Sequence, residues 1–380
     1  MKPLTGIRVV ELARILAGPW CGQLLADLGA EVVKVERPGS GDDTRHWGPP
    51  FVTAPDGSPR DAAYFHATNR GKRSVAIDIA TPEGQAEVRA LVATADVVIE
   101  NYKVGGLARY GLDHAALSAV RPGLITCSIT GFGQDGPYAH RAGYDFIIQA
   151  MGGAMSLTGE PDGPPQKAGV AYADLFTGLY SAVAILAALR RRDVTGEGAW
   201  IDMALLDTQV AVLANQGLNW MTGDRVPTRM GNGHANLVPY QAFETADGAL
   251  IVAVGNDGQF ARLCGVLGLA LHDDPRFATN PARVTHRRAL IAAVQAAIAT
   301  WRKADLYEAL EAAGIPAGPI NALDEVFADR QVIARGMAIR PDGLPGLASP
   351  IVIDGERMVA ERGAPERPGR PKFTKFTLVR

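Results

Sequence analysis

The first 130 residues alternate short runs of β-branched residues with segments of helical character, and this alternation limits the chain to few folds. The runs predict strands over 7–12, 31–36, 74–79, 96–101 and 124–130, with helices over 19–28 and 81–93. Strands and helices that alternate at this spacing are joined by right-handed crossovers. The pattern therefore predicts an α/β fold built on a parallel, doubly wound sheet.

Later segments have a different character. Residues 38–72 form a polar stretch that we expect to be one long loop, and such loops are usually functional or covered by a partner. Gly, Asn, Pro and Thr cluster over 222–238, and a strand over 248–254 and helices over 259–269, 285–301 and 304–313 follow. These predict a smaller α+β domain of about a hundred residues. The run 201–206 fits either a strand or the start of a helix.

The last fifty residues lack the pattern of a separate core. From Val332 the chain is rich in Pro and Gly, and it ends in a basic tail with Lys372, Lys375 and Arg380. A segment of this kind has no apolar face of its own to bury. We therefore expect it to pack on another domain or subunit.

Composition excludes several functional classes. A net charge of −2 gives no electrostatic case for nucleic acid or an anionic membrane as partner, and no apolar segment reaches the ~20 residues of a membrane span. The three cysteines, Cys21, Cys127 and Cys264, and the scattered histidines lack metal-ligand spacing, so we expect no metal and a reducing cytoplasm. The first strand-to-helix turn lacks G-x-G-x-x-G, which argues against a nicotinamide or flavin enzyme.

Asp174 stands at the head of an apolar run, 175–189, that predicts a buried helix. Aspartate at a helix start most often caps it. The unpaired N–H groups and the helix dipole would also keep such a carboxylate ionised near neutral pH. An ionised, partly desolvated carboxylate is a usable nucleophile toward an activated acyl group, with nearby backbone N–H groups to stabilise the oxyanions. The segment alone leaves both roles open.

Three basic clusters lie at the ends of predicted strands of the same sheet. Arg37 follows the second strand, Arg70, Lys72 and Arg73 precede the third, and Asn101–Lys103 with Arg109 follow the fourth. Together they predict a phosphorylated, nucleotide-like ligand at the strand ends. Each also has a plainer interpretation, because Glu36 and Arg37 can form a surface ion pair and the 70–73 cations can lie on a solvated turn.

The segment 230–236 carries two glycines around Asn232, followed by His234. It fits a flexible connector between domains. It also fits a lid whose N–H groups line an acyl site, because glycines let the backbone approach a ligand closely. His234 is either a solvated loop residue or an acid–base group.

Several longer motifs together resemble the class III CoA-transferase family, which includes formyl-CoA transferases, carnitine CoA-transferases and α-methylacyl-CoA racemases. The resemblance covers nearly the whole chain. It is carried by AGPWCGQLLADLGAEVVKVERPGSGD, NRGKRSVAIDIATPEG, VVIENYKVGGLARYGL, SITGFGQDGPY, GYDFIIQAMGG and AYADLFTGLYSAVAILAAL.

The resemblance implies a fold and an assembly. It implies a Rossmann-like, CoA-binding large domain formed by residues 1–222 and 330–380, and a small α+β domain with linkers inserted over 223–329. It also implies an interlocked homodimer.

The resemblance also implies roles for individual residues. Asp174 matches the nucleophile, and the segment 231–234 (Gly231, Asn232, Gly233, His234) matches the lid of the acyl site. The CoA contacts match Leu16, Ala17, Arg37, Ile77, Ala80, Asn101, Tyr102, Lys103, Arg109, Tyr144 and Asp145.

Two positions narrow the activity. The racemase branch carries a proton-transferring histidine where this chain has Tyr144, and a tyrosine cannot replace it at neutral pH. Arg14 follows the first strand, where a guanidinium can bind the second carboxylate of a dicarboxylic acid. We therefore expect CoA to move from an acyl-CoA donor, with succinyl-CoA as the first candidate, to a carboxylic acid acceptor.

That transfer would use an aspartyl mixed anhydride and an aspartyl–CoA thioester, without metal, nicotinamide or flavin. The alternatives are a 2-methylacyl-CoA racemase or epimerase, and a non-catalytic CoA-binding protein in which Asp174 only caps its helix.

Overall fold

A computed structural model describes residues 1–223 and 225–368, which form two units. The first contains Met1–Ala154, Lys167–Ala214 and the chain from Arg330 onward, and the second contains Met155–Gln166 and Asn215–Asp329. The division differs from the expected one at two places. Residues 155–166 join the second unit, and its main segment begins at 215 rather than 223.

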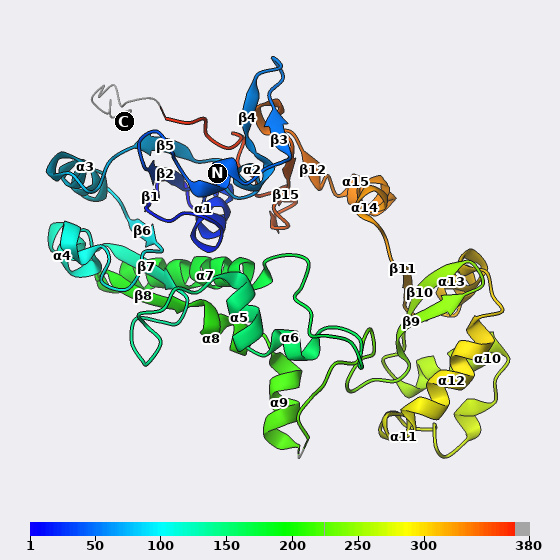
Figure 1. Cartoon of the computed structure of the whole chain (residues 1–380). Coiled ribbons are helices and arrows are strands. Elements are labelled where there is room, and N and C mark those ends of the chain that lie inside the picture. The colour runs from blue at the N-terminus through cyan, green and yellow to red at the C-terminus, as the bar shows by residue number, and fades with distance from the viewer. Residues whose placement is uncertain (224, 369–380) are drawn as a thin grey trace. The chain divides into compact units, whose positions relative to one another are not determined.

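A six-stranded parallel sheet is the centre of the first unit (Figure 1). In order across the sheet, its strands are β5 (Arg73–Ala76), β2 (Glu31–Glu36), β1 (Arg8–Glu11), β6 (Val97–Glu100), β7 (Ile125–Thr130) and β8 (Ala199–Ala204). This is the strand order of a doubly wound α/β sheet, as the alternation predicts. The order reverses between β1 and β6, and ligands bind such sheets at this point, outside the carboxyl ends of the strands.

Helices cover both faces of the sheet because its central strands are apolar on both sides. Val9, Val97 and Ile99 belong to the core that α1 (Ala17–Asp27) and α7 (Tyr172–Thr195) share. Val10 and Val98 belong to the opposite core, with α3 (Pro82–Val92) and α4 (His114–Val120). Further helices of this unit are α5 (Asp145–Met151), α8 (Leu205–Ala211) and the 3₁₀ turn η2 (Ala108–Tyr110), whereas α6 (Ala154–Leu157) begins at the last residue of a segment of this unit and continues into the second.

Helix α7 meets the criterion for a membrane span by length and composition alone, so the expectation that no segment does so is wrong. Its apolar character has a local cause, because Ala173, Ala182 and Ile185 are buried in the core that α7 shares with α1. The approach of the two helices is close at Gly178. A Cβ placed there would lie 2.6 Å from the carbonyl oxygen of Ala17 and 2.9 Å from the Trp20 ring.

The prediction of one long loop over 38–72 is wrong. The segment folds into η1 (Asp43–His46), the hairpin of β3 (Phe51–Thr53) and β4 (Pro59–Ala62), and α2 (Ala63–Thr68). The physical reason is Arg45, which is fully buried, pairs with Glu36 and Asp61, and stacks 3.7 Å over the Phe65 ring. The undecided run 201–206 contains the end of β8 and the start of α8.

The second unit is α+β. Its antiparallel sheet has the order β11 (Ala317–Pro319), β10 (Gly248–Ala253) and β9 (Tyr240–Thr245). Its helices are α9 (Ala214–Thr222), α10 (Asp257–Leu267), η3 (Leu271–Asp273), α11 (Asn280–Thr285), α12 (Arg287–Ile298), α13 (Lys303–Ala312) and α14 (Leu323–Ala328). A separate core, including Phe243, Leu250 and Leu290, joins sheet and helices.

The chain from residue 330 packs on the first unit rather than forming a core. Its short elements are α15 (Arg330–Ala334), β12 (Ala338–Ile339), η4 (Pro341–Gly343), β13 (Gly346–Leu347), β14 (Val352–Ile353) and β15 (Glu356–Arg357). Met358 enters the α1 core, and the amide of Ala360 donates to Asp27 at 2.8 Å. Lys372, Lys375 and Arg380 lie outside the described residues.

Replacing Gly178 tests the close contact of α1 and α7. Gly178→Ala is expected to destabilise the protein by about 1–3 kcal/mol, because the new methyl group would overlap the Ala17 backbone. Gly265→Ala is the matched control, since that helical glycine has open space around its Cβ position, and it should stabilise by about 1 kcal/mol through helix propensity. Thermal unfolding of both variants checks this, and a neutral Gly178→Ala would contradict it.

Candidate active site

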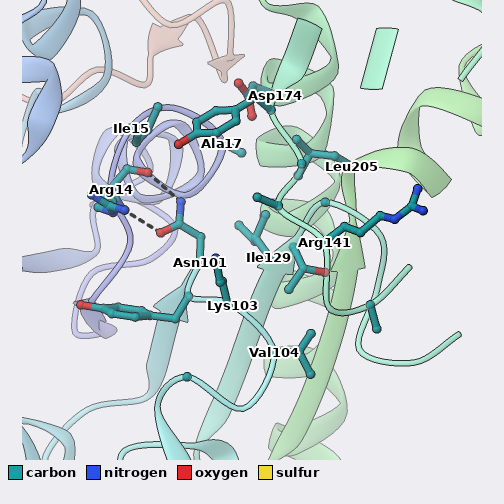
Figure 2. A pocket seen from close by; sticks show the side chains of 18 of the residues that line it. Arg14, Ile15, Ala17, Asn101, Lys103, Val104, Ile129, Arg141, Asp174 and Leu205 are labelled. Carbon is teal, nitrogen blue, oxygen red and sulfur yellow. Dashed lines mark hydrogen bonds between the residues drawn. The ribbon is translucent and has the colours of Figure 1, made fainter. Parts of the chain in front are cut away.

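A pocket of about 430 Å³ opens at the carboxyl ends of β1, β6 and β7, where the strand order reverses (Figure 2). It brings together nine of the residues that the sequence singles out. Those that line it are Arg14, Leu16, Ala17, Asn101, Tyr102, Lys103, Arg109, Tyr144 and Asp174. Residues from three separate loops and the start of α7 therefore share one cavity.

Asn101 holds the first turn of the pocket. Its Oδ1 accepts from the Arg14 amide at 3.0 Å, and its Nδ2 donates to the Arg14 carbonyl at 2.7 Å, as Figure 2 shows. The next residue, Ile15, has a φ of +74°, which a β-branched residue rarely adopts and which costs about 1–3 kcal/mol. Its amide donates to the Asp42 carboxylate at 3.2 Å. The turn is thus held from two sides in a strained conformation.

A buried cation, Lys34, bonds to the residue before this turn and to the carboxylate that holds it. The ammonium of Lys34 lies 3.0 Å from Glu11 and 2.9 Å from Asp42, and it donates to the Ala13 carbonyl at 2.8 Å. Burial opposes its charge, but Glu11 and Asp42 outweigh burial and raise the pKa of Lys34 above its usual value. Asp42 therefore connects a fully buried ion pair to the backbone of Ile15.

The basic cluster at 70–73, expected to help bind a phosphorylated ligand, does not line the pocket. Lys72 is buried and lies 2.8 Å from Glu11. Arg70 pairs with buried Asp27 at 2.6 Å, and only Arg73 remains at the surface. Arg70 and Lys72 therefore neutralise buried carboxylates of α1 and β1, and these two cations do not face a ligand site.

Three further residues expected to bind CoA do not line the pocket. Arg37 is exposed, and it does not pair with Glu36, because Glu36 is buried and bonds to Arg45. Ile77 is buried in the core beneath the sheet, and Ala80 is exposed beyond the end of β5. A CoA contact at these three positions stays a prediction.

Cations surround the mouth of the pocket. Lys103, Arg109 and Arg141 are exposed, and none of them has an ion-pair partner among residues 1–223 and 225–368. Two of them are held by aromatic rings, since Arg109 lies 4.6 Å over Tyr110 and Arg141 lies 4.0 Å over Tyr138. This arrangement suits an anionic ligand that enters from solvent.

Asp174 occupies the third position of α7 and does not cap it. The N-cap residue is Ala171, which has no side-chain acceptor. Instead, the Oδ1 of Asp145 accepts from the amides of Ala173 at 2.9 Å and Asp174 at 3.4 Å. The capping role is therefore wrong for Asp174 and belongs to Asp145, which does not line the pocket.

The protein environment makes ionisation of Asp174 difficult. Burial, and then the negative charge of Asp145, raise the pKa of Asp174 to about 7. The expectation that the helix start keeps this carboxylate fully ionised at neutral pH is thus too strong, because desolvation is the larger effect. Burial followed by the same two carboxylates raises the pKa of Tyr64, which places its phenol near them.

Several pocket residues were not singled out from the sequence. They are Ile15, Val104, Gly106, Ile129, Thr130, Gly131, Ala139, Arg141, Ala142, Gly143 and Leu205. Gly131 and Gly143 carry a signal, because a Cβ on Gly131 would lie 2.5 Å from the Gly143 Cα. Two loops can approach this closely only if both residues lack a side chain.

The segment 231–234 belongs to the second unit. The Gly231 amide donates to the Gly159 carbonyl at 3.0 Å. His234 accepts through Nδ1 from the amides of Asn236 at 3.0 Å and Leu237 at 3.1 Å. Its free ring nitrogen is therefore Nε2. Within the described parts of the chain, no group of three or more metal-ligating side chains occurs.

The raised pKa of Asp174 has a measurable effect on stability. The native carboxyl binds more protons than the unfolded one between pH 4 and 7, so its ionisation lowers the free energy of unfolding as the pH rises. Asp174→Asn removes this penalty, and its gain in stability should be larger at pH 8 than at pH 5 by roughly 2–3 kcal/mol. Thermal melts at both pH values check this, and an equal gain at both would contradict the raised pKa.

Comparisons with known proteins agree with this site. The family model described as CoA-transferase family III matches residues 4–369. The succinate–glutarate CoA-transferase of Agrobacterium fabrum is 58% identical over 96% of this chain and 92% of its own length. The succinyl-CoA:glutarate CoA-transferase of mouse (Mus musculus) is 46% identical over 89% of this chain and 77% of its own length.

A crystal structure of a CAIB/BAIF family protein from Brucella suis has the same fold. It is 57% identical, has a TM-score of 0.85 and is covered over 96% of each chain. The chain therefore belongs to CoA-transferase family III and is a CoA-transferase, as its motifs predict.

Proposed function

We propose that this enzyme moves CoA between dicarboxylic acids, with succinyl-CoA as donor and glutarate or a similar acid as acceptor. The observation that carries the proposal is the position of Asp174, a partly desolvated carboxylate on the wall of a pocket surrounded by cations. Several relatives are named for succinyl or glutarate substrates, which agrees with this chemistry.

The proposed reaction exchanges one activated acyl bond for another. The Asp174 carboxylate attacks the donor thioester, which forms a mixed anhydride and releases the CoA thiolate. The thiolate then attacks the aspartyl carbonyl, forms an enzyme-bound thioester and releases the donor acid. The acceptor carboxylate attacks the carbonyl of this thioester, which forms a second anhydride and releases the CoA thiolate again. The thiolate captures the acceptor acyl group, and Asp174 is regenerated as a carboxylate.

The start of α7 does not provide the oxyanion donors. Its first amides are occupied: Tyr172 donates to Val170, Leu175 donates to Ala171, and Ala173 and Asp174 donate to Asp145. The expectation that N–H groups beside Asp174 serve this purpose is wrong for these four. The glycine segment 231–233 has its Gly231 and Gly233 amides occupied as well, by the carbonyls of Gly159 and Met230, so we propose it only as a lid that excludes water from the anhydride.

Arg14 is the proposed contact for the second carboxylate of the substrate. It lines the pocket and is exposed, and its guanidinium pairs with exposed Asp43 through one nitrogen. An arginine has five N–H donors, so it retains others for a substrate carboxylate.

We also propose the assembly that the family resemblance implies, an interlocked homodimer in which the small domain is inserted into the large one. Helix α7 presents an apolar stripe to solvent, formed by Phe176, Leu179, Tyr180 and Val183. Its spacing of three and four residues places the stripe on one helix face, which a second copy of the chain would cover.

The three cysteines are unpaired and buried, consistent with the cytoplasmic location that we propose.

Trapping the acylated enzyme tests the proposed reaction. After incubation with succinyl-CoA, hydroxylamine should convert Asp174 to a hydroxamate, and peptide mass spectrometry should find it there. Asp174→Asn should lose the adduct and at least a thousandfold in kcat. Asp193→Asn is the matched control, because Asp193 is an exposed aspartate on the same helix, and it should keep both.

An unmodified Asp174 across a panel of acyl-CoA donors would contradict the proposal. Exchange of the α-proton of a 2-methylacyl-CoA with deuterated water, without any acceptor acid, would indicate the racemase activity instead. Tyr144 at the pocket wall leads us to expect no such exchange.

Arg14→Met tests the dicarboxylate assignment. It should raise the KM for succinate and glutarate roughly tenfold or more and leave a monocarboxylate acceptor unchanged, because only the dicarboxylates lose a charge-assisted contact. Arg73→Met is the control, since Arg73 forms a comparable exposed ion pair with Glu31 away from the pocket. Equal losses for mono- and dicarboxylates would rule out this role for Arg14.

A further inference from the structure

Asp145 joins three segments around Asp174. Its Oδ1 accepts from the amides of Ala173 and Asp174, and its Oδ2 accepts from the side-chain amide of Gln149 at 2.7 Å. Gln149 is fully buried, and its oxygen accepts from the Ala168 amide at 2.9 Å. The orientation of the Asp145 carboxylate is therefore fixed by groups from α5, α7 and the segment before α7.

Capping alone does not require a carboxylate at this position. Ser, Thr and Asn cap helices about as well as Asp, and their side chains carry no charge. A carboxylate adds a negative charge beside Asp174, which a neutral cap would avoid. The charge of Asp145 destabilises the ionised form of Asp174. Once Asp174 is acylated it is neutral, so the repulsion between the two side chains is gone.

We propose that Asp145 is a positioning residue for the transfer: it anchors the first turn of α7 and its charge favours the acylated form of Asp174 over the free carboxylate. The inference rests on the proposed function, because it needs Asp174 to be the group that is acylated. It replaces the CoA contact that the family resemblance implies for Asp145. No new bond is required, since Asp145 acts only through its hydrogen bonds and its charge.

Other ionisable groups around Asp174 come from several elements. Tyr64 of α2 interacts with both carboxylates, and Tyr172 of α7 interacts with Asp145. Tyr144 precedes α5 and lines the same pocket. Three neighbouring elements contribute uncharged residues to the pocket: Ala17 of α1, Ile129 of β7 and Leu205 of α8. The pocket cations are Arg14, Lys103, Arg109 and Arg141. Among these groups, Asp145 is the one carboxylate that raises the pKa of Asp174.

The experiment compares variants that separate charge from capping. Asp145→Asn keeps the acceptor for α7 and removes the charge. Asp145→Asn with Gln149→Leu also removes the clash of two amides that the single change creates. In both, the acid limb of kcat/KM, measured with succinyl-CoA, should move to lower pH by about one unit. Asp145→Ala should lower the melting temperature and kcat together, because two amides of α7 lose their acceptor.

Asn256→Ala is the control for a lost cap, since Asn256 caps α10 in the second unit by accepting from the Gln259 amide at 2.9 Å. It should lower the melting temperature without moving the acid limb. An unchanged limb in both Asp145→Asn variants would overturn the inference, as would an equal displacement in Asn256→Ala.

A ¹³C NMR titration of the Asp174 carboxyl in Asp145→Asn provides a readout that does not need turnover. A lower pKa than in the native protein is expected, and an unchanged one would overturn the inference. Failure of the inference stays distinct from failure of the proposed function, because the latter is shown only by the absence of the hydroxylamine-trapped Asp174.

Discussion

The contact between one carboxylate and the first turn of α7 determines how this site works. Asp145 accepts hydrogen bonds from the amides of Ala173 and Asp174. The side chain of Asp174 therefore does not cap the helix and lines the pocket instead. It is held there partly out of water, beside a second negative charge. A carboxylate in this environment is more basic than one in solvent, and its charge would be lost in the anhydride that we propose. This environment is therefore consistent with the proposed covalent chemistry.

The turn of Arg14 and Ile15 in the pocket wall depends on buried charges. Lys34 lies between Glu11 and Asp42, and Asp42 holds the strained amide of Ile15. Desolvating such charges is costly, and breaking one pair would leave an uncompensated charge in the interior. Strain at a turn persists only where the surroundings determine it fully. Here the buried ion pairs hold the turn on one side. Asn101, at the end of the neighbouring strand β6, holds it on the other through two hydrogen bonds to the backbone of Arg14.

Local patterns in the sequence predict what local forces decide. The run 31–36 predicts β2 with its observed bounds, and Thr81, the first residue of the predicted helix 81–93, caps α3 by accepting from the Gly84 amide at 3.0 Å. Patterns fail where the partner is remote in sequence. The sequence around Lys72 is typical of a surface turn, but Lys72 is buried because it pairs with Glu11. The segment 38–72 is folded because Arg45 pairs with Asp61 and stacks on Phe65. The cap of α7 comes from Asp145, so no residue adjacent to the helix reveals it.

The central claim is that Asp174 becomes covalently joined to the acyl group. The most direct measurement is one turnover of the succinyl-CoA-loaded enzyme with glutarate whose carboxylates carry ¹⁸O. In the proposed sequence, one acceptor oxygen bridges the second anhydride and remains on the enzyme when the thiolate takes the acyl group. The peptide that contains Asp174 should therefore gain a single ¹⁸O atom. Formation of labelled glutaryl-CoA with no ¹⁸O in that peptide would contradict the account.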